Sequence, residues 1–388
     1  MKNFSYNSPT KIVFGKDQIQ ALPNLLKEHS VKKLLFVYGK SSIKKLGIYD
    51  EVLKMCKDLT IEVIEEGGVR PNPSLDSVLS GRKKALQHDV DFVLAAGGGS
   101  AIDAAKAMAF AVFMEEADVW KAYTREKNPT KALPIGTILT LAATGTETNG
   151  NTVVTNDQAN KKYGIAHPFL RPVFSIIDPS YTMSVDHHHS IAGSVDIMMH
   201  VFEQYFCNTT RTETADHMAV GVLKSVIENV NRLLDGEDDY ETRANLSWAS
   251  TIGWSHLLQQ GKVGDWATHR LSYPLTADYG ITHGFALSSL HTAWMEVALK
   301  YNEATMSSRL KFLADELFGG CDFKEVPERL SDIYKSFDAP TSLKEAGLKL
   351  NDKDLEKLAK DTVSLGDVGT VIKIDQQRAL EIFKRANR

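Results

Sequence analysis

An apolar run that ends in three glycines constrains the fold of this chain more than any other part of its sequence. Residues 92–96 are Phe-Val-Leu-Ala-Ala, Gly97–Gly99 and Ser100 follow, and a helix-like stretch spans residues 102–113. Glycines adopt positive φ readily and let a backbone approach a ligand closely. A helix N-terminus presents free N–H groups and a partial positive charge to a phosphate. This order of elements predicts an α/β fold with a phosphate-binding turn at the end of a buried strand.

The same turn has a simpler interpretation, in which Ser100 caps the helix and Asp103 is its capping-box partner. Three consecutive glycines exceed what a cap needs, which favours phosphate binding. The run is not the Rossmann G-x-G-x-x-G motif, because residue 102 is Ile. The segment Gly39–Ser41 is not a Walker A loop either, since residue 34 is Leu. It still follows a strand-like run and has the Lys and Ser side chains to receive the adenosine end of a nucleotide.

The first part of the chain alternates short β-branched apolar runs with helix-like stretches such as residues 18–28. Such alternation predicts βαβ units around a mostly parallel sheet. The runs lie at residues 11–14, 34–38, 61–64, 92–96, 134–141 and 173–177. Residues 151–155 and 163–165 flank a polar loop and predict a hairpin.

The pattern changes after Asp178-Pro179 to the 3.6-residue spacing of helices, as in residues 219–234, 355–362 and 379–383. We therefore expect an α/β domain over residues 1–180. An all-helical domain is expected over residues 181–388.

Composition excludes several classes of protein. The 388 residues include 45 Lys+Arg and 49 Asp+Glu, a net charge of −4. That balance argues against a nucleic-acid partner bound through a basic face. No apolar run approaches the roughly 18–20 residues of a membrane span, and residues 1–11 lack the apolar core of a signal peptide. These features predict a cytoplasmic protein with neither a membrane nor a nucleic-acid partner.

Only three cysteines occur, Cys56, Cys207 and Cys321, widely spaced and odd in number. They form no disulfide framework and no C-x-x-C pair, so we expect three reduced thiols. Any metal ion must then be held by imidazoles and carboxylates.

One carboxylate and three imidazoles have the spacing of such ligands. Asp196 and His200 are four residues apart in a helix-like segment and share a face. His269 and His283 lie 14 residues apart in a segment with few charges. Together they would suit Fe²⁺ or Zn²⁺, although an i,i+4 Asp–His pair alone is more often a surface contact. The run His187–His189 is expected to be a solvated loop, because adjacent side chains diverge and chelate poorly.

With these segments the chain resembles the iron-containing (group III) alcohol dehydrogenase family, in its NAD(P)H-dependent butanol dehydrogenase and aldehyde reductase branch. The resemblance covers nearly the whole chain and ends with the D-x-x-x-H segment and the two histidines 14 residues apart. Its other motifs are residues 9–15, 38–39, 68–73, 97–106, 139–147 and 177–179. The resemblance implies dinucleotide binding for the α/β domain and metal and substrate binding for the all-helical domain.

The resemblance implies a role for each matching residue. The metal ligands would be Asp196, His200, His269 and His283. Gly97 to Ser100 would cradle the pyrophosphate, Thr140 and Thr144 would bind around the adenine and phosphates, and Asn72 and Lys162 would lie at the nicotinamide end. The cofactor-binding set is Gly39, Lys40, Ser41, Ser42, Asn72, Gly97, Gly98, Gly99, Ser100, Asp103, Thr140, Thr144 and Lys162.

Cofactor choice follows from one position. Members of the family that prefer NAD often carry an Asp where this chain has Gly39, and that carboxylate would repel a 2′-phosphate. Without it, Lys40, Ser41 and Ser42 can donate hydrogen bonds to a phosphate. We therefore expect NADP(H) to be preferred over NAD(H).

One position departs from the family pattern. Many relatives carry a histidine four residues after His269, where this chain has Tyr273, followed by Pro274. The unperturbed pKa of tyrosine is about 10. Tyr273 is therefore a candidate for proton transfer, but solvent and the cofactor ribose hydroxyl are the favoured route.

The implied activity is hydride transfer between NAD(P)H and the carbonyl of small aldehydes by a metal-dependent enzyme, expected as a homodimer. Alternatives within the superfamily are a glycerol-dehydrogenase-like polyol oxidoreductase and a dehydroquinate-synthase-like lyase. A catalytically silent nucleotide-binding protein is an alternative of another class. Glu203 would either support the metal ligands or be a solvated helix charge, and Trp254 and Trp266 would line a pocket, although helix packing is the favoured role of Trp254.

Overall fold

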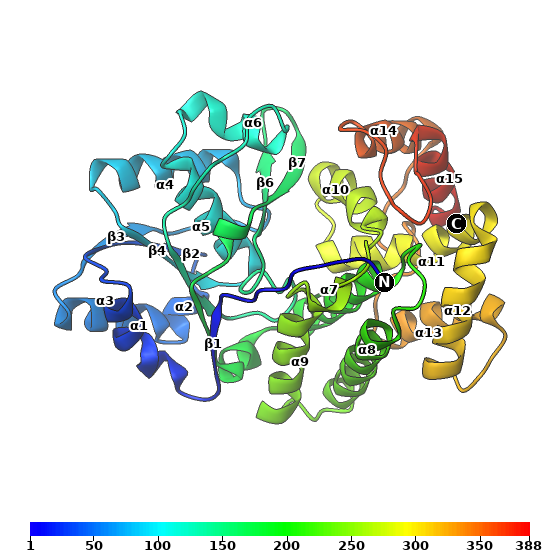
Figure 1. The fold of residues 1–388 in the computed structure, drawn as a ribbon, viewed down its shortest axis with the longest axis horizontal. Helices are drawn as coiled ribbons and strands as arrows, with labels where there is room; N and C mark the ends of the chain where they lie inside the picture. The colour runs from blue at the N-terminus through cyan, green and yellow to red at the C-terminus, as the bar shows by residue number, and fades with distance from the viewer. The chain divides into compact units, whose positions relative to one another are not determined.

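A computed structural model describes all residues from 1 to 388, and these form two compact units (Figure 1). The α/β unit contains residues 7–185 and 239–247. The helical unit contains residues 1–6, 186–238 and 248–388. The expected boundary at residue 180 lies close to residue 185. The sequence pattern did not predict that residues 1–6 belong to the helical unit or that residues 239–247 belong to the α/β unit.

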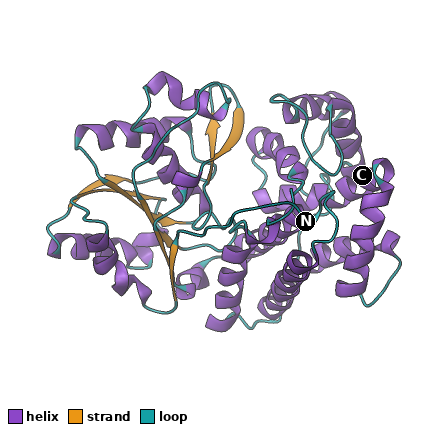
Figure 2. Cartoon of the chain, viewed as in Figure 1, coloured by secondary structure: helices purple, strands orange, loops and turns teal.

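The α/β unit is built on a six-stranded sheet in which every neighbouring pair is parallel (Figure 2). All six runs singled out in the sequence form its strands, with ends that differ by at most two residues. A separate antiparallel pair, β6 (Asn151–Asn156) and β7 (Lys161–Ala166), is the expected hairpin. The order across the sheet is β1 (Lys11–Phe14), β8 (Phe174–Ile177), β5 (Ile135–Leu139), β4 (Phe92–Gly97), β2 (Lys33–Tyr38) and β3 (Glu62–Glu66).

Helices cover both faces of this sheet (Figure 1). Alternate residues of β2 and β4, such as Leu34 and Phe92, face a core shared with α1, α2 and α3. The opposite face packs against α5, which is almost entirely buried. Strands covered on both sides read as continuous apolar runs, which is why they were recognisable in the sequence. The helices of this unit are α1 (Leu22–Glu28), α2 (Ser42–Lys45), α3 (Ile48–Asp58), α4 (Leu75–Gln87), α5 (Gly99–Ala111) and α6 (Val119–Tyr123).

The helical unit is centred on two long buried helices, α7 (His187–Tyr205) and α11 (His283–Tyr301), which pack on each other. The predicted helical repeats at residues 219–234, 355–362 and 379–383 all lie in helices. The remaining helices of this unit are α8 (Glu213–Leu234), α10 (Ala267–Tyr279), α12 (Glu303–Leu317), α13 (Val326–Ser336), α14 (Asp352–Thr362) and α15 (Gln376–Ala386). Helix α9 (Tyr240–Gly253) is divided, with residues up to 247 in the α/β unit and the rest in the helical unit. The predicted fold class, a parallel α/β domain with a helical domain, is confirmed.

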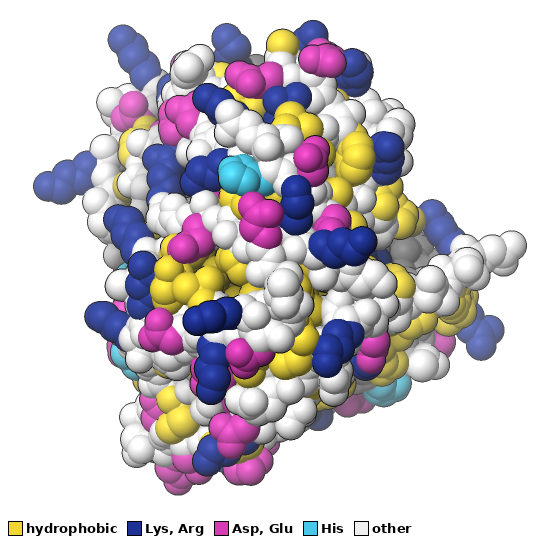
Figure 3. Space-filling model, turned by 90° about the vertical axis from the view of Figure 1, so that its left-hand side faces the viewer, with side chains coloured by type: hydrophobic (Ala, Val, Ile, Leu, Met, Phe, Trp, Pro, Cys, Tyr) yellow, Lys and Arg dark blue, Asp and Glu magenta, His cyan; other side chains and the backbone are white.

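The surface agrees with the balanced composition. On the face drawn in Figure 3, Lys and Arg side chains alternate with Asp and Glu side chains and do not merge into one basic area. None of the helices has the length and hydropathy needed to cross a membrane.

Candidate functional site

The residues expected to bind the cofactor gather at one edge of the sheet. From β2 the chain goes to β3 on one side and then returns to β4 on the other side of β2. In open α/β sheets, ligands bind at the carboxyl ends of the strands where the order reverses in this way. Gly39 follows β2, Gly97 ends β4, and Thr140 follows β5, whose neighbour is β4. The Thr140 N–H donates to the Gly97 carbonyl at 3.1 Å.

The glycine turn is shaped by the loop that packs on it. Gly97 has a φ of +152°, which favours glycine. A Cβ placed on Gly99 would lie 2.7 Å from the Thr144 side chain. A side chain at position 99 would therefore push Thr144 away from the first turn of α5, where the free N–H groups lie.

The capping interpretation of this turn is wrong. Gly98, not Ser100, is the N-cap of α5, and no side chain caps it. The Ser100 Oγ accepts from the Asn72 N–H at 3.2 Å. Asp103 accepts from the Thr146 Oγ1 at 2.7 Å and from the Val153 N–H at 3.0 Å. Both side chains are half-buried and bond other segments of the chain.

Three residues predicted to serve the cofactor meet although they are far apart in the chain. The Lys162 Nζ donates to the Asn72 Oδ1 at 2.7 Å, and Asn72 in turn bonds Ser100. Asn72 has a φ of +55°, a conformation that asparagine tolerates better than most residues. Lys40, Ser41 and Ser42 are exposed beyond the end of β2.

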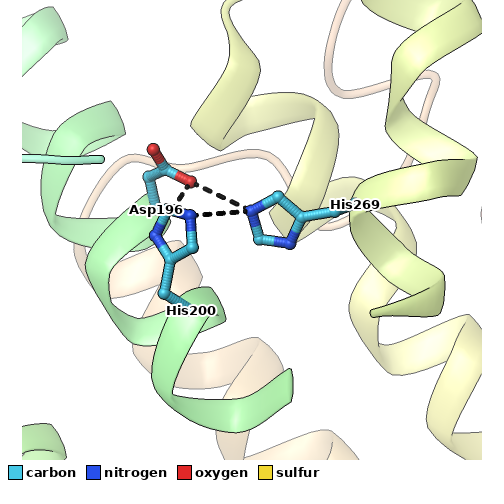
Figure 4. A group of neighbouring side chains, drawn as sticks. All are labelled: Asp196, His200 and His269. Carbon is cyan, nitrogen blue, oxygen red and sulfur yellow. Dashed lines mark hydrogen bonds and ion pairs between the residues drawn. The ribbon is translucent and has the colours of Figure 1, made fainter. Parts of the chain in front are cut away.

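A second group of polar side chains lies in the helical unit and consists of the four predicted metal ligands. Asp196 and His200 come from α7, His269 from α10, and His283 is the first residue of α11. Figure 4 shows the first three pointing toward one another. The Asp196 Oδ1 lies 3.5 Å from the His269 Nε2 and 3.8 Å from the His283 Nε2, and the Nε2 atoms of His200 and His269 are 3.1 Å apart.

These distances fit a shared cation. Two nitrogens bound to one tetrahedral Zn²⁺ at about 2.0–2.1 Å lie roughly 3.3 Å apart. Asp196, His200 and His269 are buried, yet the Asp196 Oδ1 and the His200 Nδ1 have no hydrogen-bond partner. Buried polar atoms without partners are rare and costly. Imidazole and carboxylate are the donors that Zn²⁺ or Fe²⁺ takes from proteins.

The carboxylates and imidazoles of this group shift one another's pKa values. Burial alone would raise the pKa of Asp196, but the imidazoles of His200, His283 and His269 outweigh it and hold that pKa below its ordinary value. Burial alone would lower the pKa of His269, but the carboxylates of Glu203 and Asp196 raise it to about 9. Burial lowers the pKa of His200 to about 4. A proton on His269 therefore faces the neutral His200, and a metal ion would have to displace it.

Glu203 supports His269 and is not a solvated helix charge. It is 3% exposed. Its Oε2 lies 2.5 Å from the His269 Nδ1, and its Oε1 accepts from the His269 N–H at 3.1 Å. A carboxylate bonded to one ring nitrogen fixes the tautomer and turns the other nitrogen toward a metal. The sequence offered only a weak signal for this, namely that Glu203 lies one turn after His200.

Tyr273 lies one turn after His269 on α10 and is half-buried. The Arg270 guanidinium lies over its ring at 5.7 Å from the centroid. Pro274 follows inside the helix and lacks the N–H that would bond the Arg270 carbonyl. The structure thus places Tyr273 on the ligand-bearing helix, and its role in proton transfer stays a prediction.

Two other expectations about aromatic residues are wrong. His187–His189 form the first turn of α7 rather than a loop, because Asp186 caps that helix. They remain exposed and do not converge. Trp254 is not packed within a helix, since α9 ends at Gly253. It is half-buried and stacks on the His200 ring at 5.4 Å between centroids.

Comparison with known proteins decides the family. The model of the iron-containing alcohol dehydrogenase family matches residues 9–179, and the model of the C-terminal part of the Fe-containing alcohol dehydrogenase family matches residues 190–387. The chain belongs to the iron-containing alcohol dehydrogenase family. The resemblance noted in the sequence and the predicted enzyme class, an oxidoreductase, are therefore confirmed.

Members of this family resemble the chain over its full length. It is 38% identical to a probable NADH-dependent butanol dehydrogenase 1 of Bacillus subtilis, with 99% of each chain covered. It is 32% identical to the NADPH-dependent aldehyde reductase YqhD of Escherichia coli, with 90% of each chain covered. The crystal structure of NADH-dependent butanol dehydrogenase A from Thermotoga maritima superposes with a TM-score of 0.95 at 35% identity and covers 100% of this chain and 99% of that one.

Proposed function

We propose that this member of the iron-containing alcohol dehydrogenase family interconverts small aldehydes and alcohols by hydride transfer with NAD(P)H, and that it requires one divalent metal ion, Fe²⁺ or Zn²⁺. The observation that carries the proposal is the convergence of three buried residues, Asp196, His200 and His269, whose possible ligand atoms all lie within 4.8 Å of one another. The half-buried His283 adds a fourth, with its Nε2 at 3.8 Å from the Asp196 Oδ1, and that oxygen has no hydrogen-bond partner in the protein.

The two absent groups would supply the reactive chemistry when bound. The metal is a Lewis acid for the substrate oxygen, and the nicotinamide carries the hydride. The side chains of the protein would orient the bound groups and supply the charges around them. Asp196 contributes one negative charge, and Glu203 keeps the Nε2 of His269 turned toward the group. Trp254 is half-buried and stacks on His200, and its apolar ring next to a candidate ligand favours an apolar substrate chain on that side.

In the α/β unit the chain would bind and orient the nucleotide. The N-terminus of α5 faces the pyrophosphate, with Gly99 allowing close approach. Lys162 and Asn72, which bond each other, would hold the nicotinamide end. The carboxylate of Asp103 accepts hydrogen bonds from Thr146 and Val153. Asp103 would therefore affect cofactor binding indirectly, by fixing the position of the loop that contains Thr146.

We further propose that NADP(H) is preferred over NAD(H). The support is local: no carboxylate stands at Gly39, and Lys40, Ser41 and Ser42 are exposed beside it. The names of the relatives divide, since the Bacillus protein is called NADH-dependent and the Escherichia protein NADPH-dependent. Kinetics with the two cofactors decide this directly.

A cytoplasmic homodimer is proposed as the form of the enzyme. The support is that all three cysteines are free, and that β1 is an edge strand of the sheet with one side unpaired by any other strand of the chain. Sedimentation of the purified protein tests the dimer.

The deciding experiment is metal reconstitution followed by an assay. Protein stripped with a chelator is reloaded with Fe²⁺, Zn²⁺ or neither, and NADPH and NADH oxidation is followed with butanal and related aldehydes. Turnover that appears only after reloading supports the proposal. A protein that takes up metal and NADPH but reduces no aldehyde or ketone contradicts it, and the silent nucleotide-binding alternative would then stand.

A further inference from the structure

Lys106 is a buried lysine of α5 that the proposed chemistry does not use. The whole lysine, including its side chain, is 0% exposed to solvent. Its Nζ donates to the backbone carbonyls of Thr146, Asn149 and Asn151 at 2.6, 2.7 and 2.9 Å. The Thr146 Oγ1 and the Asn149 Oδ1 lie at 2.8 and 3.3 Å. Five oxygens thus surround one nitrogen, and the three carbonyls match the three donors of an ammonium group.

The carbonyls belong to a loop that would otherwise be costly to bury. The loop joins β5 to β6, and every residue from 145 to 150 is buried. Connecting loops normally run over the surface, because buried backbone groups must find partners. Lys106 supplies those partners from the neighbouring helix, because its ammonium group bonds two carbonyls of the loop and the carbonyl of Asn151, where β6 begins.

Asp103, one turn before Lys106 on α5, also hydrogen-bonds this loop and the strand that follows it. It accepts from the Thr146 Oγ1 and the Val153 N–H, and its own carbonyl accepts from the Thr152 Oγ1 at 2.7 Å. Burial lowers the pKa of Lys106 to about 7, against the pull of the carboxylates of Asp103 and Glu147. Both of these carboxylates therefore favour the charged form of the lysine.

The loop held in this way also shapes the glycine turn. Its residue Thr144 packs on Gly99, where an added Cβ would lie 2.7 Å from the threonine side chain. The position of the 144–151 loop thus determines how much of the first turn of α5 a phosphate can reach.

We propose that Lys106 is a positioning residue for the nucleotide, because its ammonium group acts as a built-in cation that holds the 144–151 loop against α5 beside Gly99. This inference rests on the proposed function, in which that turn binds NAD(P)H. Lys106 does not contact the cofactor itself, so its loss should change nucleotide affinity more than the rate of the chemical step.

The test compares Lys106→Met with Lys262→Met in the full-length, metal-loaded enzyme. Lys262 is the matched control, since it is a buried lysine of the helical unit that pairs with Asp216. The dissociation constant of NADPH is measured by fluorescence titration, and kcat is measured at saturating NADPH. For Lys106→Met we expect the dissociation constant to rise at least about tenfold while kcat changes less than about threefold. For Lys262→Met we expect a lower melting temperature and an unchanged dissociation constant.

Chemical rescue then tests whether the site accepts a cation. Lys106→Ala leaves a space beside the five oxygens, and added methylammonium or ethylammonium should restore NADPH affinity. Lys106→Met fills that space with a neutral side chain and should not respond. Faster hydrogen exchange at residues 144–151, with unchanged exchange elsewhere, is expected in both variants.

The outcomes separate the inference from the proposed function. If the unaltered enzyme binds neither NADPH nor NADH, the proposed function fails. If it binds NADPH and the folded Lys106 variants bind equally well, or if ammonium ions help Met and Ala variants alike, the role of Lys106 is overturned. Should both Lys106 variants fail to fold, Thr146→Val removes one oxygen of the site and leaves the lysine in place. An NADPH dissociation constant about threefold higher then supports the role, and an unchanged one overturns it.

Discussion

Each unit of the molecule buries a charged cluster, and the two clusters differ in how completely the protein satisfies them. In the α/β unit, the Lys106 ammonium finds five oxygens of one loop within hydrogen-bond distance. In the helical unit, the Asp196 Oδ1 and the His200 Nδ1 have no hydrogen-bond partner although their residues are buried, and they face each other at the longer distance of 3.6 Å. A buried polar network stabilises a structure when every member is paired and costs stability when some are not. The cluster around Lys106 therefore stabilises the fold of the α/β unit. The cluster around Asp196 has the donor atoms and the negative charge to bind a cation.

The largest effect that tests this comparison is expected for Asp196→Asn. The change keeps the shape of the side chain but removes the only carboxylate among the four residues. Turnover should fall at least about a thousandfold with loss of bound metal, since a Lewis acid supplies several kcal/mol of charge stabilisation. The melting temperature of chelator-treated protein should fall less than in a variant that loses hydrogen-bonded charge pairs, because the Asp196 Oδ1 makes only ion-pair contacts of 3.5–3.8 Å with the imidazoles. Metal analysis, kinetics and thermal unfolding measure these three quantities.

Asp216→Asn is the matched control for that variant. Asp216 is a buried carboxylate of the same unit, but Lys262, Arg309 and Thr212 all bond it. Removing its charge leaves two buried cations short of a partner and should cost about 3–5 kcal/mol of stability, with metal content unchanged. If Asp196→Asn were the more destabilising of the two, the contrast between unsatisfied and satisfied clusters would be wrong.

Glu203→Gln should weaken metal binding without removing a ligand. The neutral amide holds His269 less firmly, and the loss of its charge lets the pKa of His269 fall. Loss of an outer-shell carboxylate typically weakens metal affinity about 10–100-fold. Titration against a competing chelator measures this. Glu303→Gln, at an exposed residue in the first turn of α12, serves as the control. Equal affinity in the two variants would contradict the assigned role of Glu203.

A third buried site, which is neutral, predicts part of the pH dependence of stability. The His291 Nδ1 lies 2.8 Å from the Tyr334 hydroxyl, and burial lowers the pKa of His291 to about 3 from its ordinary 6.5. As the pH falls below 6.5, the unfolded chain takes up a proton that the folded protein excludes, so stability is lost. The loss is about 1.4 kcal/mol per pH unit, or about 2 kcal/mol at pH 5.

Urea unfolding between pH 7 and pH 5 measures this loss. His291→Phe should flatten that part of the profile, whereas Tyr334→Phe, which removes only the hydrogen bond, should keep it. An unchanged slope in His291→Phe would show that the histidine is not excluded from protonation in the folded state.

The smallest effect is expected for Lys40→Ala, at the exposed end of the α/β unit. An exposed charge pair is worth up to about 1 kcal/mol, so KM for NADPH should rise about fivefold. KM for NADH, which has no 2′-phosphate, should stay within about twofold. The exposed Lys45→Ala on α2 is the control. A similar rise for both cofactors would argue against a 2′-phosphate site at Lys40.

Much of this protein could be predicted because the relevant signals are local. Strands buried on both faces read as apolar runs, and amphipathic helices repeat every 3.6 residues, so the sheet and the later helices were recognisable. The pair Asp196 and His200 was predictable because a helix places residues four apart on one face. Helix boundaries were less predictable. Ser100 is of a residue type that is common at N-caps, but the N-cap of α5 is Gly98.

What the sequence could not supply is the meeting of distant segments. The sequence could not tell whether Glu203 faces solvent or His269, because the two residues are 66 positions apart and their separation carries no information about distance in space. The link from Lys162 to Asn72 spans 90 residues, and Lys106 gave no sign of bonding a loop 40 residues away.

The sequence by itself determined the parallel sheet, because periodicity is a property of the chain. Its resemblance to the family, more than spacing, indicated the four candidate ligands. Only the tertiary structure decided which buried charges are satisfied and which are not. Burial makes polar groups dependent on whatever the fold brings within about 3 Å. Asp103 and Lys106 thus support a loop, whereas Asp196 and His200 each keep a buried atom without a hydrogen bond.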